Sequence, residues 1–150
     1  MADITVTAAN VGPAFPGSAR IRSFLAGAAI QGGQAVYIDS NGLAQLTAGG
    51  ATTTSNFAGI ALPRMNTAYA AGAGQAVEVL QEGEVEGFAL SGLAYYAPVY
   101  LSNTSGTLGS TAGTHGQGII GVVVPTSDKD SSGNPRKVLR LRDPINTASA

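Results

Sequence analysis

The residues that could do chemistry in this chain are few and scattered. The one histidine, His115, lies in the glycine-rich stretch AGTHGQG. General-base catalysis would need an activated serine and an orienting carboxylate beside it, and no spacing in the sequence places such partners there. We therefore interpret His115 as a solvated loop residue. The chain has no cysteine, which excludes disulfides, thiolate catalysis and sulfur-ligated metals.

Two further motifs resemble binding loops, but each lacks a required residue. DKDSSG begins like a calcium loop at Asp128 and Asp130, yet Leu139 stands where the loop needs a bidentate glutamate. GAGQAV, which starts at Gly72, has too few glycines for a phosphate loop, and no lysine follows it. The sequence predicts an ordinary hairpin loop after Asp128, no metal or other cofactor, and no enzymatic activity.

Charged side chains form two clusters of opposite sign. Four glutamates lie in the middle of the chain and four basic residues near its end: Glu78, Glu82, Glu84, Glu86, Arg136, Lys137, Arg140 and Arg142. In an extended strand Arg140 and Arg142 share a face, because side chains alternate with a period of two. One interpretation is that the acidic ridge of one subunit meets the basic ridge of another subunit or of a partner. The other is that both clusters mark charged edge strands, which discourage aggregation.

The elements that must position these residues are short, and their order is repeated. Three phrases of the first part of the chain recur in the second: VYIDSNG (36–42) as VYLSNTSG (99–106), GIALP (59–63) as GVVVP (121–125), and AVEVL (76–80) as KVLRL (137–141). The echoes keep one order at a spacing of about 62 residues, which favours an internal duplication over chance. Within the first phrase, Asn41 and Gly42 predict a two-residue hairpin turn.

Tyrosines raise a second possible activity, because Tyr37, Tyr95, Tyr96 and Tyr100 could form a carbohydrate platform. Tyr37 and Tyr100, however, occupy equivalent positions in the two copies of the repeat. That equivalence favours a packing role for these two residues.

Composition bounds the fold and the partners. The 150 residues carry a formal net charge of −1 and only 11% are charged, which is not the footprint of a nucleic-acid binder. No apolar run approaches a bilayer span, and MADITV lacks the features of a signal peptide, so we expect no membrane partner and synthesis in a cytoplasm. Abundant glycine and short valine and isoleucine clusters predict an all-β fold. We expect a small β-barrel or β-sandwich, β-tulip-like, built from two similar halves.

The expected organisation is one β domain between two ends. Residues 1–19 contain Pro13 and Pro16 and, after Met1, only four large apolar side chains, so we interpret them as an extended N-terminal arm outside the self-contained core. Residues 20–142 form the domain, with repeat halves at about 20–82 and 83–142. Residues 143–150 form a flexible tail.

Six phrases taken together resemble a known family. In order they are GGQAVYIDSNGLAQL, FAGIAL, AVEVLQEGEVEG, APVYLSNTSGTL, GIIGVVV and RKVLRL. This arrangement, with the opening MADITVTAANV, is similar to the capsid cement or head decoration proteins of tailed bacteriophages. The resemblance implies a small β-rich protein that does no chemistry and binds the phage major capsid protein on the outside of the expanded capsid. It also implies a homo-oligomer, a trimer or alternatively a dimer, made in the bacterial host cytoplasm and located on the outer surface of the virion.

The expected contacts to the capsid or to a neighbouring subunit lie near both ends of the chain. They combine the apolar residues of the arm with nearby and C-terminal arginines: Ile4, Val6, Val11, Phe15, Arg20, Arg22, Arg140 and Arg142. An extended arm suits this role because it can add a strand to a neighbouring sheet edge. The alternative function is a carbohydrate-binding or adhesion β-module displayed on a virion or cell surface.

Overall fold

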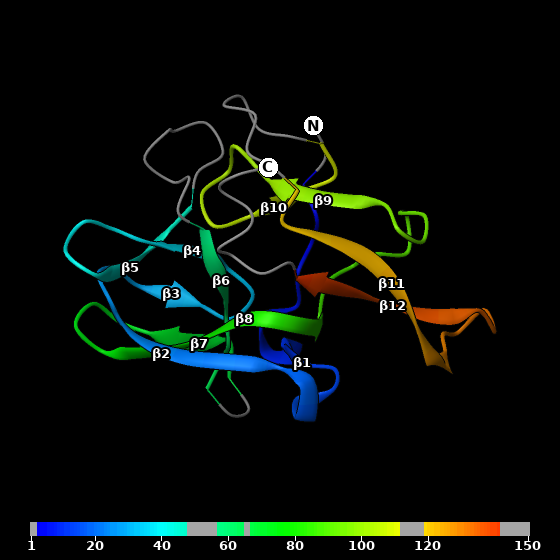
Figure 1. Cartoon of the computed structure of the whole chain (residues 1–150), viewed down its shortest axis with the longest axis horizontal. Helices are drawn as coiled ribbons and strands as arrows, with labels where there is room; N and C mark the ends of the chain where they lie inside the picture. The colour runs from blue at the N-terminus through cyan, green and yellow to red at the C-terminus, as the bar shows by residue number, and fades with distance from the viewer. Residues whose placement is uncertain (1–2, 48–56, 65–66, 112–118, 142–150) are drawn as a thin grey trace.

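A computed structural model describes residues 3–47, 57–64, 67–111 and 119–141. Within these ranges the chain is almost entirely strands and turns, which confirms the all-β prediction (Figure 1). The elements are two short 3₁₀ turns and twelve strands: η1 Ala8–Asn10, β1 Gly12–Pro13, η2 Pro16–Ser18, β2 Arg20–Ala26, β3 Ile30–Gln31, β4 Ala35–Ile38, β5 Leu43–Leu46, β6 Phe57–Ala61, β7 Tyr69–Ala71, β8 Ala76–Glu86, β9 Pro98–Leu101, β10 Leu108–Gly109, β11 Gly121–Lys129 and β12 Pro135–Leu141.

The long strand β8 is the axis of the molecule and belongs to both halves of the repeat. Its first part pairs with β2 on one side and β6 on the other, and its last part pairs with β1 and β12. The strand lies across the centre of the body in Figure 1. The glutamates of β8 therefore do not lie on an edge strand. This corrects the interpretation of the acidic cluster as part of a charged edge strand. The reason is the length of β8, whose eleven residues give room for partners along both sides.

The first half closes on itself as a small five-stranded barrel. The neighbours run β8, β2, β5, β4 and β6, and β6 pairs again with β8. Among the strand pairs of the described residues, only β2–β5 is parallel, at Leu25↔Leu43 and Ala26↔Ala44. The core inside is built mainly from alanine and valine, such as Ala44, Ala61 and Val79. Small side chains fit the interior of so small a barrel.

The second half repeats the pairing of the first, in the order β8, β12, β11, β9 and β10. Val36 faces Gly59 in the first half, and the equivalent Val99 faces Gly121 in the second. The repeat also contains an offset, because Ile60 faces Leu80 whereas Val122 faces Arg140. In the pairing Arg140 is therefore equivalent to Leu80, whereas the sequence phrases align Leu80 with Leu141, one residue further on.

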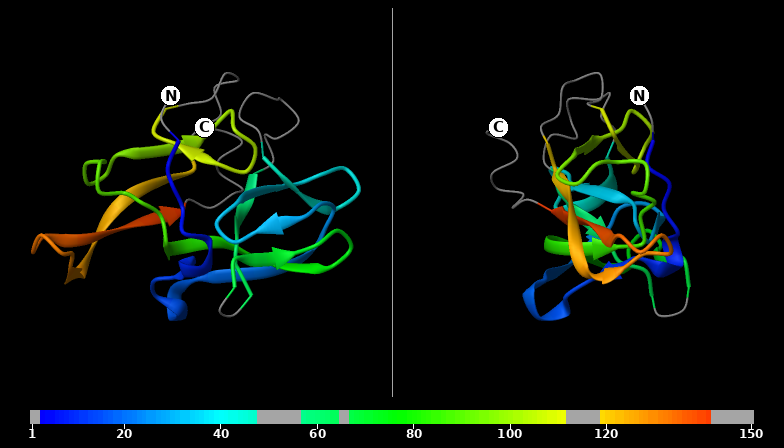
Figure 2. Two further views of the ribbon diagram at one scale, coloured as in Figure 1. Left: turned by 180° about the vertical axis from the view of Figure 1, so that it is seen from behind. Right: turned by 90° about the vertical axis from the view of Figure 1, so that its right-hand side faces the viewer.

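The two halves close in different ways. In the first half β2 pairs directly with β5, whereas in the second half the N-terminal segment fills the corresponding place. Asp3 forms an antiparallel bridge with Gly109 and Val6 forms one with Phe88, so this segment lies between β10 and the chain that continues from β8. The backbone N–H of Ile4 donates to the carbonyl of Leu108 at 2.8 Å. Figure 2 shows the segment running from the N-terminus past β10 towards β8. Residues 3–7 thus take the place of a strand, and η1 follows them.

Two residues of the segment that we interpreted as an arm outside the core lie inside the core of the structure. Ile4 and Val11 are only 7% and 6% exposed, and both belong to the main apolar cluster with Leu108 and Val85. A Cβ on Gly87 would lie 2.8 Å from the Cα of Val11, so the segment packs directly against the backbone of the second half. The physical reason is that β10 and β8 leave a gap one strand wide, and paired backbone with buried apolar side chains offsets the entropy of ordering the segment.

Candidate functional site

The described ranges contain no group of three or more His, Cys, Asp and Glu side chains placed to hold a metal ion. His115 lies outside the described residues. The same ranges contain no helix whose length and apolar character would let it cross a membrane. The remaining candidates are therefore the polar turns, the charged strands and the exposed surface.

The stretch after Asp130 is a hairpin turn, as predicted. One carboxylate oxygen of Asp130 accepts hydrogen bonds from the backbone N–H groups of Ser132 at 2.8 Å and Asn134 at 3.0 Å. Gly133 has a φ of +84°, which closes the turn. The Asp130 oxygens thus satisfy the backbone of the turn itself.

The same turn occurs in the first half at Asp39, whose carboxylate accepts from the N–H groups of Asn41 at 2.8 Å and Leu43 at 2.9 Å. The second oxygen accepts from Gln45 at 3.0 Å. The hydrogen bond from the Leu43 backbone, then that from Gln45, lowers the pKa of Asp39. Only Gly42 of the Asn41-Gly42 pair has a positive φ, so the expected two-residue turn is corrected to a longer one closed by aspartate.

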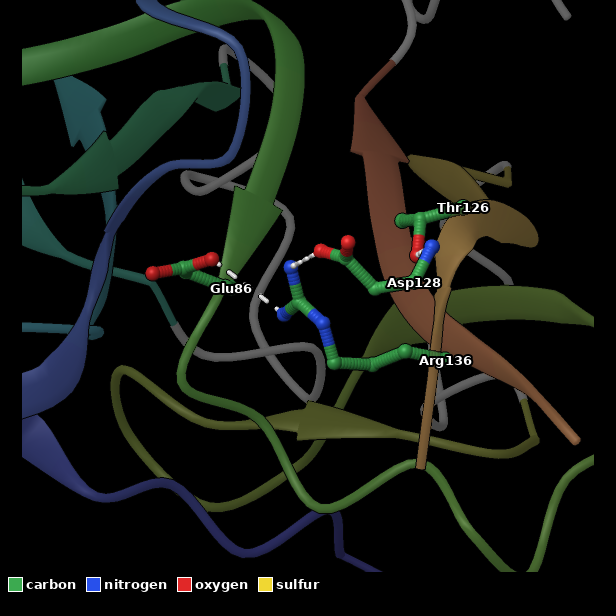
Figure 3. Close-up of polar contacts among 4 residues, drawn as sticks. All are labelled: Glu86, Thr126, Asp128 and Arg136. Atoms are coloured by element: carbon green, nitrogen blue, oxygen red, sulfur yellow. Dashed lines mark hydrogen bonds and ion pairs between the residues drawn. The ribbon is translucent and has the colours of Figure 1, made fainter. Parts of the chain in front are cut away.

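The acidic cluster of β8 meets basic residues of its own chain. Arg20 lies 3.6 Å from Glu82, and the guanidinium of Arg136 joins Glu86 at 3.2 Å to Asp128 at 3.4 Å. Figure 3 shows Arg136 between the two carboxylates. Arg136 lies near the turn of the β11–β12 hairpin, next to the pair Lys129↔Pro135, and this hairpin projects from the body in Figures 1 and 2. These exposed pairs each contribute little to stability. They do satisfy part of the acidic ridge without a second subunit.

Of the four apolar N-terminal residues, Phe15 and Val6 are accessible to a partner, and Phe15 is the more exposed of the two. Phe15 is 43% exposed, in the loop that joins β1 to β2. Val6 is partly buried against the core, and Ile4 and Val11 are fully within it. Of this group, only Phe15 presents a large apolar surface to the outside.

The basic candidates lie in two places. Arg20 and Arg22 are exposed on β2, where the Arg22 guanidinium lies 5.2 Å from the centre of the Phe24 ring. Arg140 is exposed on β12 and faces Glu84 of β8 across the sheet. Arg142 lies outside the described residues. The structure thus separates the β2 pair from Arg140 by the width of β8.

The tyrosines differ in exposure. Tyr37 and Tyr100 are half-buried on the equivalent strands β4 and β9. The Tyr95 hydroxyl donates to the carbonyl of Pro135 at 2.7 Å, and the Lys137 ammonium lies 5.0 Å from its ring centre. Tyr96, at 66% exposed and with a φ of +65°, is the most open of the four.

Sequence reasoning named Arg20 and Arg22 but missed the other exposed residues of β2, Ile21, Ser23 and Leu25. Four consecutive residues of this strand, Arg20 to Ser23, are exposed, and Leu25 is 55% exposed. Beside the strand lies a cavity of about 670 Å³ whose lining includes Ser23, Leu62 and Glu78. Arg20, Ile21 and Arg22 do alternate between polar and apolar residues, but such alternation does not show whether a strand lies at the edge of a sheet.

Comparison with known proteins identifies the family of this chain. Residues 5–142 match the family described as structural cement protein (E217 gp24/Pam3 gp6), a phage cement family. No curated protein and no solved structure matches the chain. Because the match covers most of the chain, the protein belongs to the family of phage structural cement proteins. It is a structural component of the virion capsid that stabilises the shell.

Proposed function

We propose that this protein binds the outer surface of the expanded phage capsid and bridges neighbouring copies of the major capsid protein. The observation that supports the proposal most is the match to the structural cement family over residues 5–142. The described surface fits this role, since it carries open strand and loop positions such as Ile21, Leu25 and Tyr96.

The stabilisation follows from mass action. A protein that binds only the expanded shell lowers the free energy of that shell by an amount that grows with ligand concentration over Kd. When one bound unit touches several capsid subunits, each further contact forms at a high effective concentration. Many weak contacts thereby resist the rearrangement or rupture of the shell.

We further propose that the protein acts as a homo-oligomer, a trimer or alternatively a dimer, and that it is made in the bacterial host cytoplasm before it joins the virion. Closed symmetry suits a capsid, because a symmetric unit matches a symmetry axis of the shell with identical contacts. Phe15, Arg20, Arg22 and Arg140 are the exposed candidates for contacts with the capsid or between subunits.

The test is co-sedimentation of the purified protein with expanded, undecorated phage capsids, together with its solution mass by light scattering. The proposal predicts saturable binding at a fixed ratio to the major capsid protein. The solution mass would distinguish trimer, dimer and monomer. Absence of binding to these shells, combined with binding to glycans, would instead support the adhesion module.

A further inference from the structure

The backbone of β2 presents hydrogen-bonding groups along one open side. The N–H of Ala26 donates to the carbonyl of Gln75, which continues the antiparallel ladder between β2 and β8. In such a ladder, alternate residues direct their N–H and C=O groups to the partner strand. Arg22 and Phe24 therefore bond to β8, and the backbone groups of Ile21 and Ser23 point away from it.

In the part of the chain that the structure describes, the outer side of β2 is paired only at its end. There, β5 pairs with Leu25 and Ala26. The side chains of Arg20, Ile21, Arg22 and Ser23 are all exposed. The strand lies along the margin of the body in both Figure 1 and the left view of Figure 2. The stretch from Arg20 to Phe24 is thus an open strand edge, which we call the β2 edge.

Two copies of this chain fit together poorly through their β2 edges about a two-fold axis. Antiparallel pairing about a two-fold axis centred on Arg22 would place the two Arg22 side chains opposite each other, and centring on Ile21 would place Arg20 opposite Arg22. Like charges directly opposite each other destabilise a sheet. Centring on Ser23 would require the outer side of Leu25, which Leu43 already occupies.

We propose that the β2 edge binds an extended acidic segment of the capsid protein, which adds a strand to the sheet. This inference rests on the proposed function and specifies the contact that carries it. Arg20 and Arg22 are two residues apart and so share a face of β2, which suits an incoming strand with carboxylates at alternate positions. Arg20 would then bind a carboxylate of that strand in addition to Glu82, which lies 3.6 Å from it. The residue between those carboxylates lies opposite Ile21, which is 41% exposed and favours an apolar partner.

The same arginines explain how the edge stays open before it reaches the capsid. Charged side chains on an edge strand discourage pairing with identical edges. An acidic strand removes that repulsion and gains main-chain hydrogen bonds at Ile21 and Ser23. The positive charge of the β2 edge therefore repels another β2 edge and attracts the acidic capsid segment.

The first test is hydrogen exchange at single amides, on the free protein and on the protein bound to expanded, undecorated capsids. The amides of Ile21 and Ser23 are expected to become protected on binding. Those of Arg22 and Phe24 serve as internal controls, because β8 already protects them in the free protein. Unchanged exchange at Ile21 and Ser23 in saturated capsids would overturn the inference.

The second test compares Ser23→Pro with the control Ser23→Thr by capsid co-sedimentation. Proline removes the outward N–H and blocks the edge, while the N–H groups that bond to β8 stay intact. We expect Ser23→Pro to weaken binding at least about tenfold and Ser23→Thr to bind as the parent does. Equal binding of a folded Ser23→Pro variant would overturn the edge inference alone. Failure of the unmodified protein to bind would overturn the proposed function and the inference together.

Discussion

Gly59 and Gly121 show at the level of single residues how the duplication is built. A Cβ at Gly59 would lie 2.3 Å from the carbonyl oxygen of Leu80, and one at Gly121 would lie 2.6 Å from that of Arg140. Both distances are below any normal contact, and Gly59 also has a φ of +152°. The two glycines hold equivalent places in the two halves, where one strand crosses close to the next.

We therefore expect Gly59→Ala and Gly121→Ala each to lower the free energy of unfolding by about 2 kcal/mol or more, because the backbone must move to admit a methyl group. Urea unfolding followed by circular dichroism measures the effect. Gly92→Ala is the matched control, since nothing lies within 4 Å of a Cβ at that position. Parental stability in both test variants would show that the crossings are looser than described.

Asp39 gives a prediction for pH. Its pKa is lowered in the folded protein, first by the Leu43 backbone hydrogen bond and then by Gln45. A carboxyl group with a depressed pKa contributes stability above its unfolded value of 3.8, and this contribution is lost as the pH falls through the lower folded value. The difference in Tm between the parent and Asp39→Ala should thus be largest near neutral pH and shrink below pH of about 4. A difference independent of pH would contradict this role.

At the level of elements, the N-terminal segment is the main departure from the sequence prediction. Ile4 and Val6 alternate like a strand, but Pro13 and Pro16 favoured an arm. The partners of the segment, Phe88 and Leu108, lie more than eighty positions along the chain. Local patterns carry no information on such pairing, which is why the closing role of residues 3–7 could not be predicted.

Ile4 and Phe15 should separate folding from binding. Ile4→Ala is expected to lower the free energy of unfolding by about 2 to 4 kcal/mol, because it empties a buried site between the segment and β10. Phe15→Ala should change stability by less than about 0.5 kcal/mol, since Phe15 is exposed. Thermal unfolding and capsid co-sedimentation of both variants test this.

The discriminating result is the binding of Phe15→Ala. If Phe15 contacts the capsid, this variant binds more weakly while its Tm stays near the parental value. A large loss of stability in Phe15→Ala, or none in Ile4→Ala, would contradict the placement of the two side chains. Removal of residues 1–19 as a whole is a poorer test, because it would open the second half.

The strand phrases shared by the two halves were predictable because they combine turn residues with short apolar runs. VYIDSNG and VYLSNTSG do correspond to the equivalent strands β4 and β9 and the turns that follow them. The register of the last strand was not predictable, since Leu80 and Leu141 match in sequence while Leu80 and Arg140 match in pairing. A one-residue offset depends on the bulges of the sheet, which local patterns do not specify.

At the scale of the whole molecule, the absence of a credible catalytic motif and the repeated β architecture pointed to a structural role, and the family match confirms it. The candidate contact surface was harder to predict. Of the proposed contact residues, Ile4 and Val11 are used inside the chain, whereas Arg20 and Arg22 frame an edge that becomes visible only when the strands are assembled. Which of these residues are exposed depends on how the strands pair in the folded sheet, and the sequence alone does not specify that pairing.

The measurement that tests the central claim most directly is the thermal rupture of expanded, undecorated phage capsids, followed by release of capsid protein, with increasing amounts of this protein. Stabilisation by a cement protein predicts that the rupture temperature rises with occupancy and levels off when the sites are full. An unchanged rupture temperature at full occupancy would contradict the claim, because the protein would then decorate the shell without stabilising it.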